Sequence, residues 1–331
     1  MSEGSSEYYR AKYKSLMDLP GIGEGNVQNL RKLGFNTVEN LATADTKELV
    51  FKGSGIGEEV ANRLIAEAKK IDELAVRFVT AEKYVKIRGP IVRLTSGCKP
   101  LDRLLRGGLR KKSITEFFGA FGSCKSQLCH QLAVTVQLPL EEGGLDGGCL
   151  YIDTEKVFEP ARCIEIAERF PSLDSGKILK RMLVAKAHNS EHQMMLLHNS
   201  DELIKENNIK LIIIDSLTSH FRSEYLGRGM LSPRQQLINK HMHKLKRLAT
   251  AFDAVAVVTN QVLATPDGYA GYAPSPIGGN IVGHMAHTRL FLRKGQRNQV
   301  IVQVTASPFL PWGETPVTIS DKGIVGDIVN V

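Results

Sequence analysis

The order of apolar and polar positions divides the chain into two parts with different periodicities. Over roughly the first seventy residues apolar side chains recur at helical spacing, most clearly over residues 27–33 and 59–70. From Leu94 onward, short continuous apolar runs alternate with helical stretches. That alternation is typical of a mostly parallel sheet covered by helices. The pattern therefore predicts a small all-α domain followed by a larger α/β domain.

Segments of the second part that have the length and composition of strands are, in chain order, residues 114–118, 149–153, 182–186, 211–215, 254–259, 289–293 and 300–305. Residues 211–215 form a continuous apolar run that ends in an acid, as expected for a central strand buried on both faces. Ligands of open α/β sheets bind at the carboxyl ends of the strands. Polar side chains that follow these segments are therefore candidates for one common site.

A charged segment joins the two parts. Residues 75–88 contain a short apolar stretch with Phe78 and Ala81, flanked by charged side chains. The pattern fits a linker and an edge strand equally well, and an edge strand can pair with another chain. We therefore divide the chain into an N-terminal domain over residues 1–72, a linker over 73–93 and an α/β core over 94–331.

Each of the two helical stretches follows a glycine-rich turn, L-P-G-I-G at residues 19–23 and G-S-G-I-G at residues 53–57. A tight Gly-x-Gly turn presents free amide groups at the start of the next helix, where they can hold a backbone phosphate of DNA. Such turns also cap helices in ordinary bundles. The occurrence of two turns favours a pair of helix-hairpin-helix motifs.

An octapeptide after the first expected strand has the composition of a phosphate-binding loop. Residues 119–126 read G-A-F-G-S-C-K-S and open a helical stretch over 127–137. In such a loop the amide groups bind phosphate oxygens, Lys125 contacts the β- and γ-phosphates, and Ser126 offers a hydroxyl to Mg²⁺. The strict motif has glycine before the lysine, whereas this chain has Cys124. A β-carbon there restricts the backbone and narrows the path for the phosphates.

Three polar side chains near the ends of other expected strands complete a candidate ATPase site. Asp215 fits a ligand of hydrated Mg²⁺, although a strand-end acid also serves as a helix cap. Glu155 is suited to polarise an attacking water, and Gln261 to sense the γ-phosphate. The alternative for both is an ordinary exposed side chain. Together with the loop, these residues predict hydrolysis of ATP.

The charge of the chain predicts a polyanionic partner. The 331 residues carry a net charge of +8, which suits nucleic acid. Residues 216–250 hold seven Lys and Arg against one acid, Glu224, although a solvated helix face fits equally well. The segment 264–284 is rich in glycine and proline, and its Tyr269 and Tyr272 could stack on single-stranded bases.

Composition excludes other classes. No apolar run approaches the ~18 residues that a membrane span needs, so we expect no membrane partner. The five cysteines form no C-x-x-C pair, which argues against a disulfide framework or a zinc site and for a reducing compartment, cytoplasmic or nuclear.

Further motifs are F-V-T-A at residues 78–81, L-T-S-G-C-K-P-L-D at 94–102, Y-I-D-T-E at 151–155, T-N-Q-V at 259–262 and P-I-G-G-N-I-V-G-H at 276–284. With the loop, they resemble the motifs of RadA-type recombinases, which are related to the eukaryotic strand-exchange proteins and to RecA. The resemblance covers the chain from the hairpin domain to the C-terminus. It implies a RecA-like core that uses ATP and Mg²⁺ and forms filaments or rings on single-stranded DNA. Double-stranded DNA and recombination mediator proteins would be further partners.

The resemblance also implies residue roles. It assigns ATP binding to Gly119, Ala120, Phe121, Gly122, Ser123, Cys124, Lys125, Ser126, Gln127, Arg162, Asp215 and Pro311. It assigns catalysis to Lys125, Glu155 and Gln261, with His284 nearby, and Mg²⁺ to Ser126 and Asp215. It assigns DNA binding to Arg222, Arg228, Arg234, Thr265, Tyr269, Tyr272, Gly278, Gly279 and Asn280. Phe78 and Ala81 match a polymerisation motif, in which the phenylalanine enters a pocket of the neighbouring subunit and the strand extends its sheet.

The chain departs from the family pattern at a few positions near the nucleotide. Ala120 and Cys124 replace an acid and a glycine of the loop, Ala306 replaces an acid near the subunit interface, and Trp312 stands where an acid is usual. These departures bear on turnover and nucleotide affinity but not on fold. The sequence therefore predicts an ATP-dependent strand-exchange recombinase. The alternative is a weakly hydrolysing paralogue that acts as a DNA-binding mediator, and a hexameric helicase is a more distant option.

Overall fold

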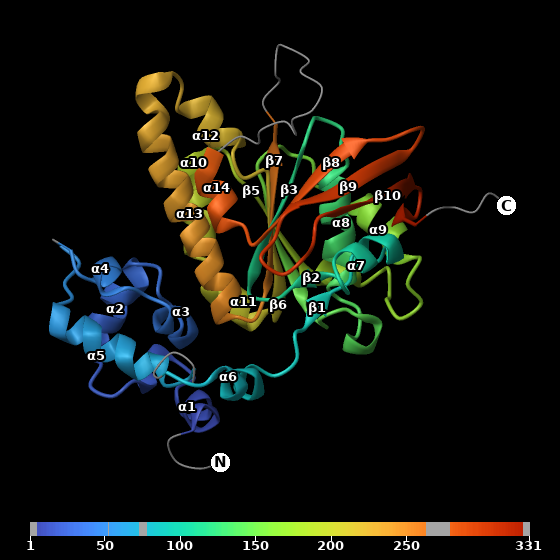
Figure 1. Ribbon diagram of the computed structural model, residues 1–331. Coiled ribbons are helices and arrows are strands. Elements are labelled where there is room, and N and C mark those ends of the chain that lie inside the picture. The colour runs from blue at the N-terminus through green and yellow to red at the C-terminus, as the bar shows by residue number, and fades with distance from the viewer. Residues whose placement is uncertain (1–4, 52, 73–77, 263–278, 327–331) are drawn as a thin grey trace.

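The computed structural model describes residues 5–51, 53–72, 78–262 and 279–326. A small helical domain lies beside a larger domain built on one sheet, and α6 (Ala81–Arg88) connects them (Figure 1). The fold is thus the α/β core with a preceding all-α domain that the sequence predicts.

The N-terminal domain consists of short helices around a compact apolar core. They are α1 (Ser6–Lys12), η1 (Leu16–Asp18), α2 (Glu24–Lys32), α3 (Val38–Ala42), α4 (Thr46–Leu49) and α5 (Glu58–Lys69). Helices α2 and α5 confirm the two expected stretches, and each begins directly after a glycine of its turn, Gly23 or Gly57. Helices α1, α3 and α4 were not predicted, because four to seven residues are too few for helical periodicity to be recognised.

The two glycine turns of this domain are tied to each other's helices. Asn29 of α2 donates a hydrogen bond of 3.2 Å to the Gly55 carbonyl, and Arg63 of α5 donates one of 3.1 Å to the Gly21 carbonyl. Each hairpin is therefore held by the helix of the other.

The segment between the two domains is described from Phe78 onward. Residues 78–80 have no strand partner among the described residues, and α6 begins at Ala81, with the Thr80 side chain accepting from the Lys83 amide. The described part of the linker therefore contains no edge strand, and Ala81 opens a helix instead. The Phe78 side chain is fully exposed.

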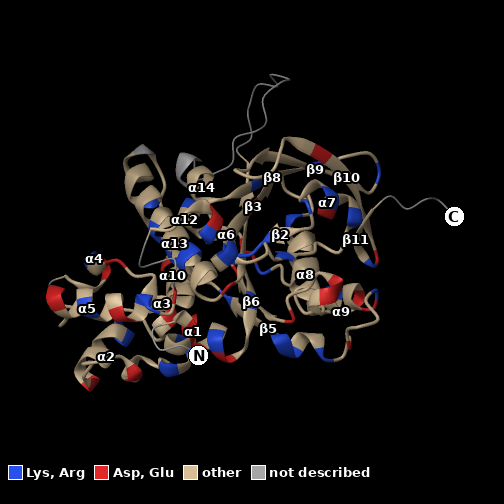
Figure 2. Ribbon diagram, turned by 60° about the horizontal axis from the view of Figure 1, so that its bottom comes forward, with Lys and Arg blue, Asp and Glu red and all other residues tan. Residues whose placement is uncertain are grey.

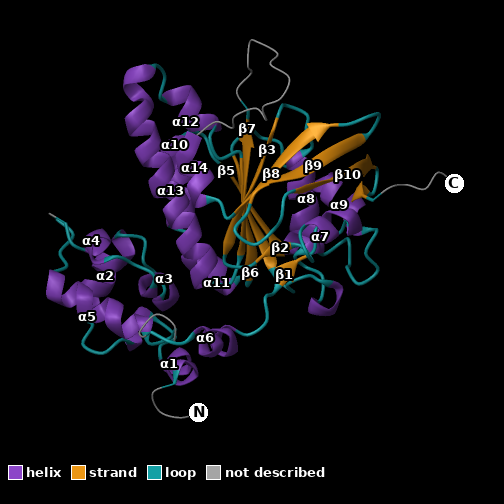
Figure 3. Ribbon diagram, in the orientation of Figure 1, coloured by secondary structure: helices purple, strands orange, loops and turns teal. Residues whose placement is uncertain are grey.

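The core sheet has nine strands in the order β11-β10-β9-β8-β3-β7-β6-β4-β5 (Figure 3). They are β3 (Ser113–Gly119), β4 (Gly148–Asp153), β5 (Met182–Lys186), β6 (Ile209–Asp215), β7 (Val255–Gln261), β8 (Thr288–Lys294), β9 (Gln299–Ala306), β10 (Gly313–Ser320) and β11 (Gly323–Val325). The pairs from β8 to β5 are parallel, and β9 to β11 continue the sheet antiparallel. A separate two-stranded sheet pairs β1 (Arg93–Leu94) with β2 (Leu109–Arg110).

Helices cover both faces of this sheet. The helical elements of the core are α7 (Lys99–Leu104), α8 (Lys125–Thr135), η3 (Leu140–Glu142), α9 (Pro160–Ala167), η4 (Ile178–Arg181), α10 (Ser190–His198), α11 (Asp201–Glu206), α12 (Ser219–Glu224), η5 (Arg228–Met230), α13 (Leu231–Ala251) and α14 (Gly279–Met285). Successive residues of β6 point to opposite faces: Ile213 packs in the apolar cluster of α8 and α9, and Ile212 in that of α10 and α13. The central strand is thus buried on both faces, as its apolar run predicts.

Strands β10 and β11 were missed in the sequence. Residues 313–320 read G-E-T-P-V-T-I-S, and a proline inside a run argues against an interior strand. Pro316 nevertheless lies in the ladder opposite Ile301 of β9. Strand β10 therefore forms because it pairs with β9, and not because of its local composition.

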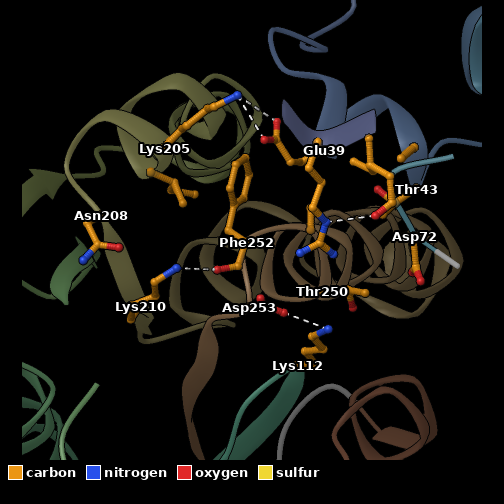
Figure 4. A pocket seen from close by; sticks show the side chains of 15 residues that line it. Glu39, Thr43, Asp72, Lys112, Lys205, Asn208, Lys210, Thr250, Phe252 and Asp253 are labelled. Carbon is orange, nitrogen blue, oxygen red and sulfur yellow. Dashed lines mark hydrogen bonds and ion pairs between the residues drawn. The ribbon is translucent and has the colours of Figure 1, made fainter. Parts of the chain in front are cut away.

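The two domains meet at a buried polar contact. Asp201 of α11 is fully buried and accepts hydrogen bonds from the Asn36 amide (2.7 Å) and the side chains of Asn36 (2.6 Å) and Asn40 (2.9 Å). Lys244 of α13 donates to the Gly34 carbonyl at 3.1 Å. Beside this contact lies a cavity of about 300 Å³, across which Lys205 pairs with Glu39 (Figure 4).

The contact corrects one interpretation of the basic stretch. Of the seven cations in residues 216–250, Lys244 is buried against the N-terminal domain and Arg247 pairs with Glu48 of α4. These two form neither a solvated face nor a DNA-binding surface. Across the described ranges, no helix combines the length and apolarity needed to cross a bilayer.

Candidate nucleotide-binding site

The loop between β3 and α8 has the geometry of a phosphate-binding loop. At Gly119 a β-carbon would lie 2.2 Å from the Leu292 carbonyl oxygen, so only glycine fits where the strand ends. Lys125 is the first residue of α8, and its ammonium donates to the carbonyls of Gly119 (3.1 Å) and Ala120 (2.9 Å). Burial lowers the pKa of Lys125, while the carboxylates of Asp215 and Glu155 act in the opposite direction. The Lys125 ammonium therefore interacts electrostatically with both carboxylates of the site, those of Asp215 and Glu155.

Cys124 occupies the glycine position of the motif in a glycine-like conformation. Its φ is 75° and its ψ is 13°, in the left-handed region that costs a residue with a β-carbon roughly 1–2 kcal/mol. The side chain is 7% exposed and belongs to the apolar cluster that includes Leu128 and Cys129. Burial raises the pKa of its thiol to about 12, so the group is neutral. The thiol is therefore largely packed beneath the loop, and its main effect is on the backbone.

Two hydroxyl groups hold the carboxylate of Asp215. Tyr151 of β4 donates a hydrogen bond of 2.7 Å to Asp215 Oδ2, and Thr259 of β7 donates one to Oδ1. All three side chains are almost fully buried. Burial, followed by the Asp215 charge, raises the pKa of Tyr151 well above its usual value, so Tyr151 stays a donor. Asp215 thus has a fixed orientation at the end of β6.

Glu155 is positioned by its own loop and by two donors. The Asp153 carboxylate accepts from the amides of Glu155 (3.2 Å) and Phe158 (3.1 Å), which shapes the turn after β4. Glu155 Oε1 accepts from the Ser216 hydroxyl at 2.8 Å and from Gln261 Nε2 at 3.2 Å. The expected general base and the expected γ-phosphate sensor are therefore in direct contact.

Arg162 on α9 is tied to both the loop helix and the far edge of the sheet. Its Nε donates to Gln127 Oε1 at 2.9 Å, its Nη2 donates to the Ser320 carbonyl at 2.5 Å, and it pairs with Glu165 at 2.8 Å. This network fixes the guanidinium at the mouth of the site.

These side chains line one cavity of about 550 Å³, a volume in the range of nucleotide sites. Of the residues expected at the nucleotide, the lining includes Phe121, Gly122, Ser123, Cys124, Lys125, Ser126, Gln127, Glu155, Arg162, Asp215 and Gln261. The Ser126 hydroxyl and the Asp215 carboxylate are both oxygen donors, which Mg²⁺ prefers. The residues present therefore fit ATP with Mg²⁺.

Three expected nucleotide contacts lie outside this lining. Gly119 and Ala120 face Lys125 through their carbonyls, and Pro311 is exposed in the turn between β9 and β10. His284 is exposed on α14 and also lies outside the lining.

Four further residues of the site were not predicted from the sequence. His130, Glu159, Glu165 and Thr259 line the cavity. His130 Nε2 accepts from the Glu159 amide at 3.2 Å, while its buried Nδ1 has no partner among the described residues. The motif Y-I-D-T-E contains Tyr151 and Asp153, but their spacing does not reveal which side chains they contact in the fold.

The expected DNA-binding residues are only partly described. Arg222 is exposed on α12, and Arg234 is half-buried on α13, with its Nε lacking a partner within the described ranges. Arg228 is in η5, and Gly279 and Asn280 open α14, but their side chains are outside the described part. Thr265, Tyr269, Tyr272 and Gly278 lie outside the described residues.

A strand, a glycine-bearing loop, a Lys-Ser pair opening a helix and a fixed acid on a neighbouring parallel strand define the chain as a P-loop ATPase. Comparison with known proteins narrows this class. Residues 87–327 match the Rad51 family, and residues 13–70 match the SAM-like helix-hairpin-helix tandem. The DNA repair and recombination protein RadA of Methanoculleus marisnigri is 44% identical over 318 residues, which cover 93% of this chain and 98% of the relative.

The chain therefore belongs to the Rad51 family of recombination proteins, with a RecA-like core and an N-terminal helix-hairpin-helix domain. The family resemblance inferred from the motifs is confirmed. Proteins of this family are DNA-dependent ATPases that use ATP with Mg²⁺ and assemble on DNA.

Proposed function

We propose that this chain is an ATP-dependent recombinase that forms filaments on single-stranded DNA and promotes homologous pairing and strand exchange in recombinational repair. The observation that carries the proposal is the arrangement of three side chains in the cavity beside the phosphate-binding loop: Asp215 is held by Tyr151 and Thr259, and Glu155 accepts from Gln261. The proposal divides the chain into residues 1–72, 73–93 and 94–331, and it places the protein in the cytoplasm on the nucleoid.

In this proposal each residue of the cavity has one task. Lys125 and the loop amides would hold the phosphates, and Ser126 and Asp215 would hold the metal, which would supply positive charge to neutralise the phosphates. Glu155 accepts a proton from the attacking water, and its bonds to Ser216 and Gln261 orient the carboxylate. Gln261 links this carboxylate to the end of β7, directly before the second expected DNA-binding segment. Through Gln261, DNA bound at that segment could therefore change the position of Glu155.

Assembly would use the exposed Phe78. Strand β5 forms one edge of the nine-stranded sheet, and its Val184 is exposed. A free edge with exposed apolar side chains can accept a strand from a second copy. Residues 78–80 have no strand partner within the described ranges, and the backbone of Thr80 is extended, which leaves this segment available for donation to a second copy. Changing Phe78 to Glu should abolish oligomers seen by light scattering while leaving the circular dichroism unchanged.

A second candidate function is a mediator that binds DNA and joins recombinase filaments with little hydrolysis. The strained backbone at Cys124 favours it, as do Ala120 and Ala306, which lack the acids usual at their positions. Slower turnover would follow from the loop without any change in fold.

ATP turnover with and without single-stranded DNA separates the two functions. We expect DNA to stimulate turnover in the wild-type chain and Lys125→Ala to abolish it. Arg222→Ala and Arg228→Ala should weaken DNA binding and flatten its salt dependence. A wild-type chain that coats single strands without stimulated turnover would be the mediator.

A further inference from the structure

A cluster of cations occupies the end of the core opposite the nucleotide cavity. We call it the basic face and define it as Arg88, Arg93, Arg106, Arg110, Lys111 and Lys246. They come from α6, β1, the turn after α7, β2, the turn after β2 and α13. None of the six makes an ion pair with any described residue. Figure 2 brings this end forward, with blue segments at α6 and beside β2.

Much of the basic face comes from one short segment. Residues 103–112 read R-L-L-R-G-G-L-R-K-K, with five cations and no acid. Leu105 and Leu109 are buried, and a β-carbon at Gly108 would lie 2.0 Å from the Leu94 carbonyl. The apolar positions therefore anchor this segment tightly to the core and leave its cations at the surface.

The packing holds these cations close together. The guanidinium groups of Arg93 and Arg110 lie over the Phe309 ring, 5.8 Å and 5.0 Å from its centroid. Arg93 also donates to the carbonyls of Leu105 (3.3 Å) and Gly108 (3.4 Å). Burial and then the charges of Arg110 and Arg106 lower the pKa of Arg93, which shows that the three cations repel one another. A polyanion would relieve that repulsion.

A groove of about 480 Å³ crosses the face between α6 and the core. Arg88, Arg110 and Lys111 line it, together with Tyr84 and Phe309. The acids along it are Asp72, which has a partner of its own, and Asp253, which pairs with Lys112 at 2.7 Å. The groove therefore keeps an excess of positive charge.

The basic face is separate from the nucleotide site and from the expected DNA-binding segments. Strand β3 begins directly after Lys112 and ends at Gly119 of the loop, about 20 Å away along the strand. The segment that holds Thr265 to Asn280 follows the carboxyl end of β7, whereas Lys246 is near the carboxyl end of α13, which leads into the start of β7. Helix α12, which carries the expected DNA-binding Arg222, follows the carboxyl end of β6, whereas the basic face lies where β3 and β7 begin, at the opposite end of the sheet (Figure 1).

We propose that the basic face binds the phosphate backbone of duplex DNA, independently of base sequence. Single-strand binding relies on open aromatic faces for base stacking. Here Arg88 covers the Tyr84 ring at 5.7 Å, and two arginines cover Phe309. Unpaired cations without stacking surfaces suit the dense phosphates of a duplex. The inference rests on the proposed function only in that DNA is the partner of both.

The test removes three exposed cations from three elements in the variant Arg88→Ser/Arg106→Asn/Lys246→Ser. Asn tolerates the φ of 55° at position 106. The matched control, Lys99→Ser/Lys180→Ser/Lys322→Ser, has the same net charge and also changes exposed cations of the core. Duplex binding is measured without nucleotide by fluorescence anisotropy over a range of salt concentrations.

For the basic-face variant we expect affinity for a duplex to fall at least about tenfold at low salt, and the salt slope to shrink by about 2–3. The control variant should lose little of its affinity for the duplex. ATP turnover stimulated by single-stranded DNA should persist in both variants. If the wild-type chain lacked this stimulated turnover, the proposed recombinase would be refuted and this inference would still stand.

Equal losses in both variants would overturn the inference, because net charge alone would then explain them. Unchanged duplex affinity in the basic-face variant would also overturn it. If that variant kept duplex binding but lost binding to a fluorescent poly-glutamate peptide, the partner would be an acidic protein segment instead.

Discussion

At the scale of single residues, the structure changes the expected effect of Cys124. The sequence predicts that its β-carbon both restricts the backbone and narrows the phosphate path. In the structure the thiol is largely buried, so the strained backbone at the start of α8 is the larger effect. Glycine adopts a φ of 75° without this cost, although it loses more conformational entropy on folding. The balance of these two effects decides the outcome of a substitution.

We predict that Cys124→Gly increases ATP affinity or turnover, because the relaxed loop can close on the phosphates. Cys124→Ala is the matched control, since it removes the thiol but keeps the β-carbon and the strain. Calorimetry with a non-hydrolysable ATP analogue and a turnover assay would measure both. Identical affinity and turnover in all three proteins would show that the β-carbon is harmless.

Tyr151 is a positioning residue for the metal ligand. We predict that Tyr151→Phe weakens metal binding, with about tenfold more Mg²⁺ needed for half-maximal turnover, because a hydrogen bond to a charged group contributes ~1.5–3 kcal/mol. Mn²⁺ binding in the presence of ATP, followed by electron paramagnetic resonance, provides a readout that does not depend on turnover. Tyr84→Phe on exposed α6 is the silent control. Unaltered Mn²⁺ affinity in Tyr151→Phe would mean that Thr259 alone orients Asp215.

At the scale of elements, a buried ion pair joins β3 to β8. Arg289 pairs with Glu116 at 2.6 Å, the Glu116 side chain is fully buried, and Asn260 donates to the same carboxylate at 2.9 Å. Arg289 also lies over Phe118 at 5.2 Å. Because this pair crosses the central part of the sheet, it couples the strand before the loop to the antiparallel extension.

We predict that Arg289→Ala lowers the free energy of unfolding by about 3–5 kcal/mol, since it leaves a buried carboxylate unpaired. Arg293→Ala on the same strand removes only the exposed pair with Glu314 at 3.1 Å and should cost less than about 1 kcal/mol. Urea unfolding followed by circular dichroism measures both. Similar midpoints for the two variants would contradict the coupling of β3 and β8.

At the scale of the whole molecule, the contact between the domains contains an ammonium group that burial disfavours. Burial, followed by the neighbouring Arg247, lowers the pKa of Lys244 to about 8. Burial together with Lys244 lowers the pKa of His198, whose ring packs against Gly34, to about 4. The docked arrangement therefore carries a cost for holding Lys244 charged below about pH 8.

The direction of the pH effect follows from this shift. Between about pH 8 and the ordinary lysine value of 10.5, the unfolded chain binds more protons at Lys244 than the folded chain, so stability rises with pH by up to about 1.4 kcal/mol per unit. We predict that this slope is present in the wild-type protein and absent in Lys244→Met. Urea midpoints measured from pH 7.5 to 10 test it. Parallel curves for the two proteins would place the Lys244 pKa at its ordinary value.

The amino-acid sequence by itself determined most strands of the core sheet and the fold class. Strand length, helical periodicity and glycine turns are local properties, so α2, α5, β3 to β9 and the loop before Lys125 could all be predicted. The positions of Asp215, Glu155 and Gln261 after expected strands predicted one common site, because strand ends meet at one edge of a parallel sheet. The family motifs added Arg162.

Only the tertiary structure decided which side chains meet. Tyr151, Thr259 and Asp215 come from three strands, and no local spacing reveals that two hydroxyls share one carboxylate. Lys244 became buried, and the cations around Phe309 were brought together, because distant segments pack against each other. Burial and charge repulsion depend on the whole folded chain, and for that reason they are absent from any stretch of sequence.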